Sequence, residues 1–302
     1  MTVQTAILDY PEKEYILPGN RLCAGCGVGI AYRFVLKALG QKTIVCLTAG
    51  CATILHGIYP KTPVMATTVN NTFASTAATA SGLAAGLKAT GRGDWKVLAM
   101  AGDGATFDMG IQALSGAAER GDNFIYLCYD NEAYMNTGVQ RSSATPAGAL
   151  TSTTPIVPKE QPKKDFMQIM DAHGIPYLAT VSCSYPDDVY KKFLKAADIE
   201  GTRFFHLAVA CPTGWWYPTK DTVKIGRLMV ESCIFPLYEI EQGRLKLTGK
   251  SLSIAKSGRK KPVDEYMALQ GRFKMITPEQ SAAFQRRVDE KWNNLLGRAV
   301  NS

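Results

Sequence analysis

Short apolar runs alternate with amphipathic stretches along most of the chain. β-Prone or apolar residues occupy positions 43–47, 97–101, 124–129, 177–181 and 204–209. Stretches with a helical pattern lie among them, at residues 29–39, 76–89 and 110–120. Such alternation is typical of a mostly parallel sheet that is flanked by helices. The pattern therefore predicts an α/β fold whose ligands bind beyond the carboxyl ends of the strands.

The alternation fades after about residue 216. Residues 224–232 predict one more helix, and residues 236–247 predict a hairpin that turns at Gln242 and Gly243. Residues 278–296 predict a terminal helix, with Thr277 as its N-cap and Pro278 at its first position. We therefore divide the chain into an α/β domain at 1–216 and a C-terminal helical and hairpin extension at 217–302, which we expect to pack on that domain and on partner subunits.

Residues 144–164 are rich in Thr, Ser, Pro and Lys and have no apolar period. They predict a long loop, and loops of this length in compact domains are usually functional or disordered.

Composition narrows the choice of location and partners. With 46% hydrophobic and 20% charged residues, the chain has ordinary globular composition. No apolar run approaches the roughly 18 residues of a membrane span, and the N-terminus lacks a signal pattern. We therefore expect a cytoplasmic protein without a membrane partner.

The net charge of +8 would suit nucleic acid, but its distribution argues against that partner. The basic residues gather late, at 259–261 and around Arg286, Arg287 and Lys291. They are typical of a solvated face, or of contact with an acidic protein such as a small electron carrier.

A glycine-rich turn joins two predicted elements. Gly102, Asp103, Gly104 and Ala105 follow the run at 97–101 and lead into the helix at 110–120. Backbone N–H groups in such a turn can receive a diphosphate. A carboxylate beside a diphosphate is repulsive unless a cation lies between them, and Mg²⁺ favours carboxylates plus phosphate oxygens. Taken alone, the turn is equally well explained as a strand end with a capping Asp.

Asn131 strengthens the interpretation because it follows the next strand. Gly-Asp-Gly followed by Asn about 25 to 30 residues later resembles the pattern of thiamine diphosphate enzymes. The resemblance implies thiamine diphosphate and Mg²⁺ as cofactors. It also implies that Asp103, Asn131 and the carbonyl of Ala133 are the Mg²⁺ ligands.

Eight cysteines in a cytoplasmic chain need an explanation other than disulfides. Half of them have only the context of core residues: Cys46, Cys128, Cys183 and Cys233. The other half lie in turns or directly after predicted strands: Cys23, Cys26, Cys51 and Cys211. Four thiolates from separate loops can hold either zinc or a [4Fe–4S] cluster.

Sequence spacing leaves both metal centres open, but the chemistry favours iron–sulfur. Thiamine diphosphate makes a bound 2-oxoacid electron-rich, and another group must accept the electrons. An iron–sulfur cluster can accept them one at a time, whereas zinc has no redox chemistry.

Five motifs occur in order along residues 17–241. They are Cys-Ala-Gly-Cys-Gly at 23–27, Ala-Gly-Cys at 49–51, Gly-Asp-Gly-Ala-Thr-Phe-Asp at 102–108, Tyr-Asp-Asn-Glu-Ala-Tyr-Met-Asn-Thr-Gly at 129–138 and Ala-Cys-Pro-Thr-Gly-Trp at 210–215. Together they resemble the β subunit of pyruvate:ferredoxin oxidoreductase and its 2-oxoacid relatives. One departure is Val28, where many relatives have an acidic residue that contacts the cofactor.

The resemblance implies specific roles. The cluster would be a [4Fe–4S] centre bound by Cys23, Cys26, Cys51 and Cys211. The loop 131–136 would wrap the diphosphate and Mg²⁺, and Asn136 would be catalytic, reaching the substrate carboxylate or the thiazolium-bound intermediate. The implied cofactor-binding set is Cys51, Gly102, Asp103, Gly104, Ala105, Asn131, Ala133 and Asn136.

The resemblance also implies partners. Thiamine catalysis needs a glutamate against the aminopyrimidine, and in this family it comes from another domain. We therefore expect an α-type subunit that supplies this glutamate and much of the substrate pocket. A ferredoxin-like subunit or domain, ferredoxin itself and coenzyme A complete the expected partners, and the chain alone should be inactive.

Several alternatives stay open. The expected reaction is oxidative decarboxylation of pyruvate to acetyl-CoA and CO₂, but the same machinery would serve oxalate or branched-chain 2-oxoacids. A second possibility is half of a non-redox thiamine enzyme with a zinc Cys₄ site. A third is a non-enzymatic assembly subunit that zinc holds together.

Overall fold

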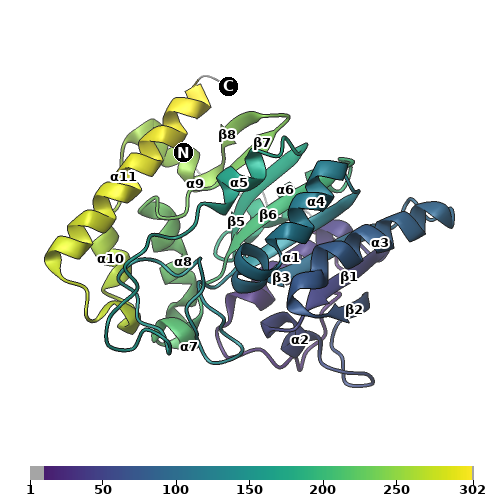
Figure 1. The fold of residues 1–302 in the computed structure, drawn as a ribbon, viewed down its shortest axis with the longest axis horizontal. Helices are drawn as coiled ribbons and strands as arrows, with labels where there is room; N and C mark the ends of the chain where they lie inside the picture. The colour runs from purple at the N-terminus through teal and green to yellow at the C-terminus, as the bar shows by residue number, and fades with distance from the viewer. Residues whose placement is uncertain (1–9, 301–302) are drawn as a thin grey trace.

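A single twisted sheet organises the chain in the computed structural model, which describes residues 10–300 (Figure 1). The sheet has eight strands in the order β2-β1-β3-β4-β6-β5-β7-β8. The strands are β1 (Thr43–Thr48), β2 (Thr67–Asn71), β3 (Lys96–Gly102), β4 (Phe124–Asp130), β5 (Tyr177–Ser182), β6 (Thr202–Ala208), β7 (Tyr238–Glu241) and β8 (Arg244–Leu247). β1 to β6 pair in parallel, whereas β7 and β8 pair antiparallel. This arrangement confirms the predicted α/β fold.

Two cores cover the two faces of the sheet. Leu98 and Met100 of β3 belong to the core that contains α1 (Gly27–Leu39) and α6 (Pro186–Ala196). Ala99 and Ala101 of the same strand face the opposite core, with α3 (Thr76–Ala89), α4 (Ile111–Arg120) and α5 (Phe166–Asp171). Successive side chains alternate between the faces, and both faces are apolar because helices cover both.

The C-terminal part forms a third core and extends the sheet. It contains α8 (Thr222–Glu231), α9 (Gly249–Ser257), α10 (Val263–Met267) and α11 (Pro278–Val300). The hairpin β7–β8 pairs with β5, and its turn residues Gln242 and Gly243 have φ of 49° and 76°. Figure 1 shows α11 along one side of the molecule, over the end of the sheet that carries β8. The division at residue 216 stays a prediction.

Most predicted elements are confirmed, including the cap of α11. Thr277 Oγ1 accepts from the Gln280 N–H at 3.2 Å, and Gln280 Oε1 accepts from the Thr277 N–H at 2.9 Å. This reciprocal pair is a capping box. The pattern missed β2, because this edge strand is polar and exposed (Thr-Thr-Val-Asn-Asn). It also missed α5, α6, α9 and α10, as well as the short helices α2 (Cys51–His56) and α7 (Pro212–Trp215).

The remaining helical turns are short. They are η1 (Phe73–Ser75), η2 (Gly104–Met109), η3 (Thr219–Asp221) and η4 (Gly271–Phe273), of which η2 is π-helical. Residues 144–164 contain neither helix nor strand, apart from an isolated bridge between Thr151 and Thr154. Within residues 10–300, no helix is both long and apolar enough to span a membrane.

Candidate functional site

The carboxyl ends of β1, β3 and β4 meet at one edge of the sheet, where the sequence predicted a ligand site. A cavity lies there. Its lining comes from three stretches that follow these strands, at 49–51, 102–105 and 129–137, together with Phe73. All eight predicted cofactor-binding residues are among them: Cys51, Gly102, Asp103, Gly104, Ala105, Asn131, Ala133 and Asn136.

Three oxygen atoms that could bind a cation gather at one wall of this cavity. The side-chain amide of Asn131 lies 3.1 Å from Asp103 Oδ1 and 2.9 Å from the carbonyl oxygen of Ala133. With its nitrogen inward, the amide donates to both of these oxygens. With its oxygen inward, three oxygens converge without a proton between them, which is the arrangement that a hard cation requires.

Asp103 is buried and has no cationic partner among its hydrogen bonds. Its Oδ2 accepts from Ser142 Oγ at 2.5 Å. Burial raises the pKa of this carboxyl well above its usual range, and the neighbouring Asp130 raises it further. A carboxylate in this position gains most from a bound cation, because a cation offsets both effects. The donor set therefore fits Mg²⁺.

The backbone after β3 packs closely against the loop that follows β4. It passes from Gly102 directly into the π-helical turn η2 and then into α4. A Cβ on Gly104 would lie 2.3 Å from the ring of Tyr134. Any side chain at this position would therefore displace the loop that follows β4. π-Helical turns often mark functional sites, and this one presents the start of a helix to the cavity.

The loop after β4 is fixed by contacts with other elements. Trp215 Nε1 of α7 donates to the carbonyl oxygen of Asn131 at 2.8 Å. Tyr134 Oη donates to Asp108 Oδ2 at 3.1 Å. Asn136 lies at the exposed mouth of the cavity. These contacts fix the positions of Asn131 and Tyr134, whereas Asn136 lies at the opening of the cavity.

Behind this loop lies a buried network of opposite charges. Asp130 contacts Lys163 at 2.5 Å and His206 Nε2 at 2.6 Å. Glu132 contacts Lys163 at 2.9 Å and Arg272 at 2.6 Å. Burial would raise the pKa of Asp130, but Lys163 and His206 lower it to about 2. Asp130 and Glu132 therefore have partners on this side, while Asn131 between them faces the cavity.

The four predicted cluster cysteines come together beside the oxygen ligands. Burial raises the pKa of Cys26 to about 12, and Cys211, Cys51 and Cys23 raise it further. Burial likewise raises the pKa of Cys51 to about 12, with added repulsion from Cys211, Cys23 and Asp103. Each thiol is therefore within electrostatic reach of the others. Mutually repelling thiolates need a positive centre to be stable.

Glycines allow the segments that carry these thiols to pack closely against their neighbours. Gly25, between Cys23 and Cys26, has φ of 74°, and a Cβ there would lie 2.7 Å from the Thr219 carbonyl oxygen. A Cβ on Gly214 would lie 2.1 Å from the sulfur of Met135. The glycines thus permit the close packing that brings the cysteine loops together.

The other cysteines are buried in the cores, as predicted: Cys46, Cys128, Cys183 and Cys233. Within the described part of the chain, no three or more His, Cys, Asp or Glu side chains surround a single point as one metal ion requires. His206, predicted to be a core residue, is buried in β6 but also forms the ion pair with Asp130.

Sequence reasoning missed the groups that support the site. Ser142, Lys163 and Arg272 contact site residues that lie far from them in the chain. The one signal was the long loop at 144–164, which supplies Lys163 and was predicted to be either functional or disordered.

Comparison with known proteins agrees with this geometry. Residues 48–207 match the model of the thiamine pyrophosphate enzyme C-terminal, TPP-binding domain. The chain is 46% identical to pyruvate synthase subunit PorB of Methanocaldococcus jannaschii, over 96% of this chain and 99% of that protein. It is 44% identical to ketoisovalerate oxidoreductase subunit VorB of Pyrococcus horikoshii, over 95% of this chain and 94% of the other.

The fold is also shared with a solved structure. A 2-oxoglutarate:ferredoxin oxidoreductase from Magnetococcus marinus superimposes with a TM-score of 0.57 at 19% identity, covering 73% of this chain and 82% of that one. The chain therefore belongs to the family of 2-oxoacid oxidoreductase subunits that includes PorB and VorB, and it carries a thiamine pyrophosphate-binding domain.

Proposed function

We propose that this chain holds thiamine diphosphate, Mg²⁺ and a [4Fe–4S] cluster within a pyruvate:ferredoxin oxidoreductase. The observation that carries the proposal is the shared edge of the sheet. The oxygen ligands and the thiols meet there, with Asn131 Nδ2 4.0 Å from Cys51 Sγ. A carbon centre activated on one side could therefore pass electrons to an acceptor on the other.

The oxygen side would hold the metal and the diphosphate. Asp103, Asn131 and the Ala133 carbonyl would bind Mg²⁺, with phosphate oxygens completing its shell. The backbone of Gly104 and Ala105 begins a helical turn, so its N–H groups would receive the diphosphate. Ser142 would keep Asp103 oriented through its hydrogen bond to Oδ2.

The thiol side would hold the cluster through Cys23, Cys26, Cys51 and Cys211. The cluster suits a thiamine-dependent oxidation better than a zinc Cys₄ site does, because zinc has no redox chemistry with which to accept electrons. When bound, the thiamine cofactor supplies carbanion chemistry at the keto carbon of the substrate, and the cluster supplies one-electron acceptance.

The remaining residues would position the substrate and shield the cofactors from water. Asn136 at the cavity mouth would orient the substrate carboxylate, because its amide can donate two hydrogen bonds there. Met135 lies against Gly214, and its thioether would exclude water between the cofactor and the cluster. Trp215 links the two sides, because Cys211 is the N-cap of α7 and Trp215 of the same helix donates to the Asn131 carbonyl oxygen.

A partner subunit would complete the active site. Among the described residues that line the cavity, Asp103 is the only carboxylate, so the glutamate that activates the aminopyrimidine would come from an α-type chain. A ferredoxin-like subunit or domain would receive the electrons and pass them to ferredoxin. Coenzyme A would take the acyl group; the Magnetococcus enzyme has coenzyme A bound.

Branched-chain 2-oxoacids are the second candidate substrates. The PorB relatives of M. jannaschii and Methanothermobacter marburgensis are 46% and 47% identical to this chain, and the VorB relatives of Pyrococcus horikoshii and Pyrococcus furiosus are 44% and 43% identical. PorB of Pyrococcus furiosus is 41% identical, so the two kinds of relative overlap in identity and both substrate classes are candidates. Viologen reduction by the reconstituted complex with each acid, with and without coenzyme A, would decide between them.

Metal analysis of the anaerobically purified complex tests the cluster. We expect about four more iron and four more sulfide per copy of this chain than the ferredoxin-like subunit or domain accounts for, in accordance with one further [4Fe–4S] centre. Cys211→Ala should lose these four iron atoms and the viologen activity, whereas Cys233→Ala, which changes a buried core cysteine, should keep both. Stoichiometric zinc, or an absence of iron in the active complex, would contradict the proposal.

A further inference from the structure

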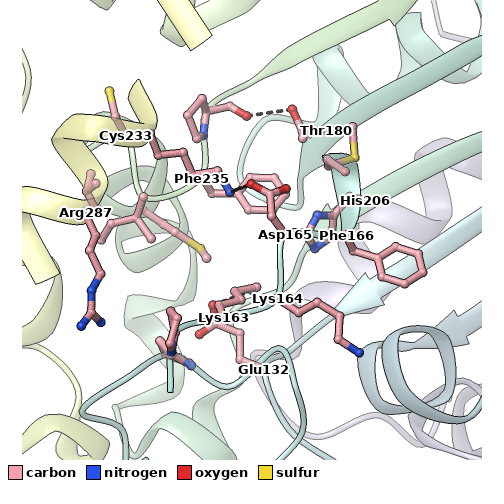
Figure 2. A pocket seen from close by; sticks show the side chains of 18 of the residues that line it. Glu132, Lys163, Lys164, Asp165, Phe166, Thr180, His206, Cys233, Phe235 and Arg287 are labelled. Atoms are coloured by element: carbon pink, nitrogen blue, oxygen red, sulfur yellow. Dashed lines mark hydrogen bonds and ion pairs between the residues drawn. The ribbon is translucent and has the colours of Figure 1, made fainter. Parts of the chain in front are cut away.

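A second, larger cavity lies on the other side of the loop that follows β4. It has a volume of about 220 Å³ and lies between the long loop, β5, β6 and α11 (Figure 2). Of the predicted site residues, none lines it; only their neighbour Glu132 does. Its walls are mainly apolar and aromatic, with Phe166, Met229, Ile234, Phe235, Phe284 and Val288. Ligand pockets in proteins share this character, and because the volume lies below the roughly 300 to 1,000 Å³ of drug-sized sites, it suits a small ligand.

The charged groups of this cavity are paired, with one exception. Lys163 contacts Asp130 and Glu132, and Lys291 contacts Asp165 at 2.7 Å. Lys164 contacts Asp108 at 3.5 Å. Arg287 alone among the lining cations has no polar partner within residues 10–300. Figure 2 shows it reaching from α11 along the edge of the cavity, while Lys163 and Glu132 lie together at the floor.

We propose that this cavity binds a small amphipathic carboxylate, with its apolar chain among the aromatic walls and its carboxylate on Arg287. A guanidinium presents parallel N–H donors that match a carboxylate. A single free guanidinium suits one negative charge, and a phosphate would call for further unpaired cations. The apolar chain would leave water for walls that are otherwise hydrated.

The proposal is independent of the redox function. The second cavity shares no lining residue with the first, and its occupant would not touch the thiols or Asp103. It also gives the long loop a role, because Pro146, Ala147, Pro162 and Lys163 of this loop line the cavity. Failure of the iron analysis would therefore leave this proposal standing, and the reverse is also true.

Isothermal titration of the assembled complex with octanoate tests the proposal. We expect saturable binding of one octanoate per chain, and weaker binding of butyrate, octanol and octylamine, which lack either the chain or the charge. Arg287→Gln should weaken octanoate binding about tenfold, the usual effect of losing one charge-assisted hydrogen-bonded pair. Arg286→Gln is the matched control, because this exposed neighbour on α11 does not line the cavity. It should change the affinity less than twofold.

Other outcomes would overturn the proposal. Equal binding of octylamine, or equal effects of the two arginine variants, would show that the guanidinium does not select the ligand. Binding by the isolated chain but not by the complex would identify the cavity as a subunit interface. Because Arg287 is exposed, a fold defect is not expected from its substitution, and an unchanged near-ultraviolet circular dichroism spectrum would confirm this.

Discussion

Two groups of ionisable residues, an inner group and an outer group that faces the cavity, flank the loop after β4. They differ in whether their charged side chains have partners of opposite charge. On the inner side, the carboxylates of Asp130 and Glu132 meet Lys163, His206 and Arg272. On the cavity side, Asp103 lies with the cluster thiols and forms no ion pair within residues 10–300. Burial and neighbouring acidic groups raise the pKa values of Asp103, Cys26 and Cys51. In the inner group, folding alone brings each carboxylate to its cationic partners. Under the proposed function, Mg²⁺ and an iron–sulfur cluster from outside the chain would complete the outer group.

This difference separates stability from function. Removing a partner from the inner group leaves a buried charge uncompensated, which unfolds proteins. Removing a carboxylate from the outer group relieves repulsion in the cofactor-free chain and damages only the binding of cations. Four predictions test this contrast, from the largest expected effect to the smallest.

Lys163→Met should lower the free energy of unfolding by about 3 kcal/mol or more, because Asp130 and Glu132 then lose a shared partner. Urea denaturation followed by circular dichroism measures this. Lys164→Met is the matched control, since the adjacent lysine is more exposed and its ion pair is longer. It should cost less than about 1 kcal/mol. Equal effects of both substitutions would contradict the proposed role of the inner group.

Asp103→Asn should weaken thiamine diphosphate binding in the presence of Mg²⁺ about 100-fold. Loss of a residue that only orients a metal ligand already costs about 10- to 100-fold in affinity, and Asp103 is itself a proposed ligand. The cofactor-free chain should be as stable as the wild type or more stable. Asp130→Asn, the same change on the neighbouring strand, should instead lower stability. Titration calorimetry and urea denaturation of both variants measure the contrast, and a destabilised Asp103→Asn chain would break it.

Much of this contrast was visible in the sequence, but not all of it. Asp103 and Asn131 were predictable because strands of a parallel sheet end at the same edge, so two short motifs fix the position of a shared site. Cys51 and Cys211 follow strands of the same sheet, whereas Cys23 and Cys26 precede α1 and were assigned from the family motif. Lys163 and Arg272 were not, because their partners are about 30 or more residues away and depend on how a loop and the C-terminal part fold back. β2 was missed because an exposed edge strand has no apolar pattern to detect.

Lys159 offers a pH-dependent test of an unpaired buried cation. Its ammonium donates only to backbone carbonyls, including that of Ser143 at 3.3 Å. Burial lowers its pKa from 10.5 to about 8, with Arg141 and Lys163 lowering it further. Above pH 8 the unfolded chain binds more protons than the folded chain, so stability rises with pH until the unfolded pKa near 10.5 is reached.

The stability difference between the wild type and Lys159→Met should therefore shift by about 1 kcal/mol in favour of the wild type between pH 8 and pH 9. Using the difference between the two proteins cancels the other groups that titrate in this range. A difference that does not change with pH would show that Lys159 is not an unpaired buried charge.

Trp215→Phe gives the smallest expected effect. It removes the indole donor to the Asn131 carbonyl and keeps an aromatic ring in the core. One neutral hydrogen bond contributes about 0.5 to 1.5 kcal/mol, so thiamine diphosphate affinity should fall only a few-fold. Tyr217→Phe, which alters a neighbouring buried ring without touching the loop, should leave the affinity unchanged. An equal loss in both variants would assign the effect to packing.

The most direct test of the central claim is electron paramagnetic resonance with Mn²⁺ in place of Mg²⁺. In the presence of thiamine diphosphate, we predict one tightly bound Mn²⁺ per chain, which excess Mg²⁺ displaces and which Asp103→Asn abolishes. If Mn²⁺ does not bind, or binds equally well to the Asp103→Asn chain, then Asp103 is not a metal ligand and the proposed cofactor site is contradicted.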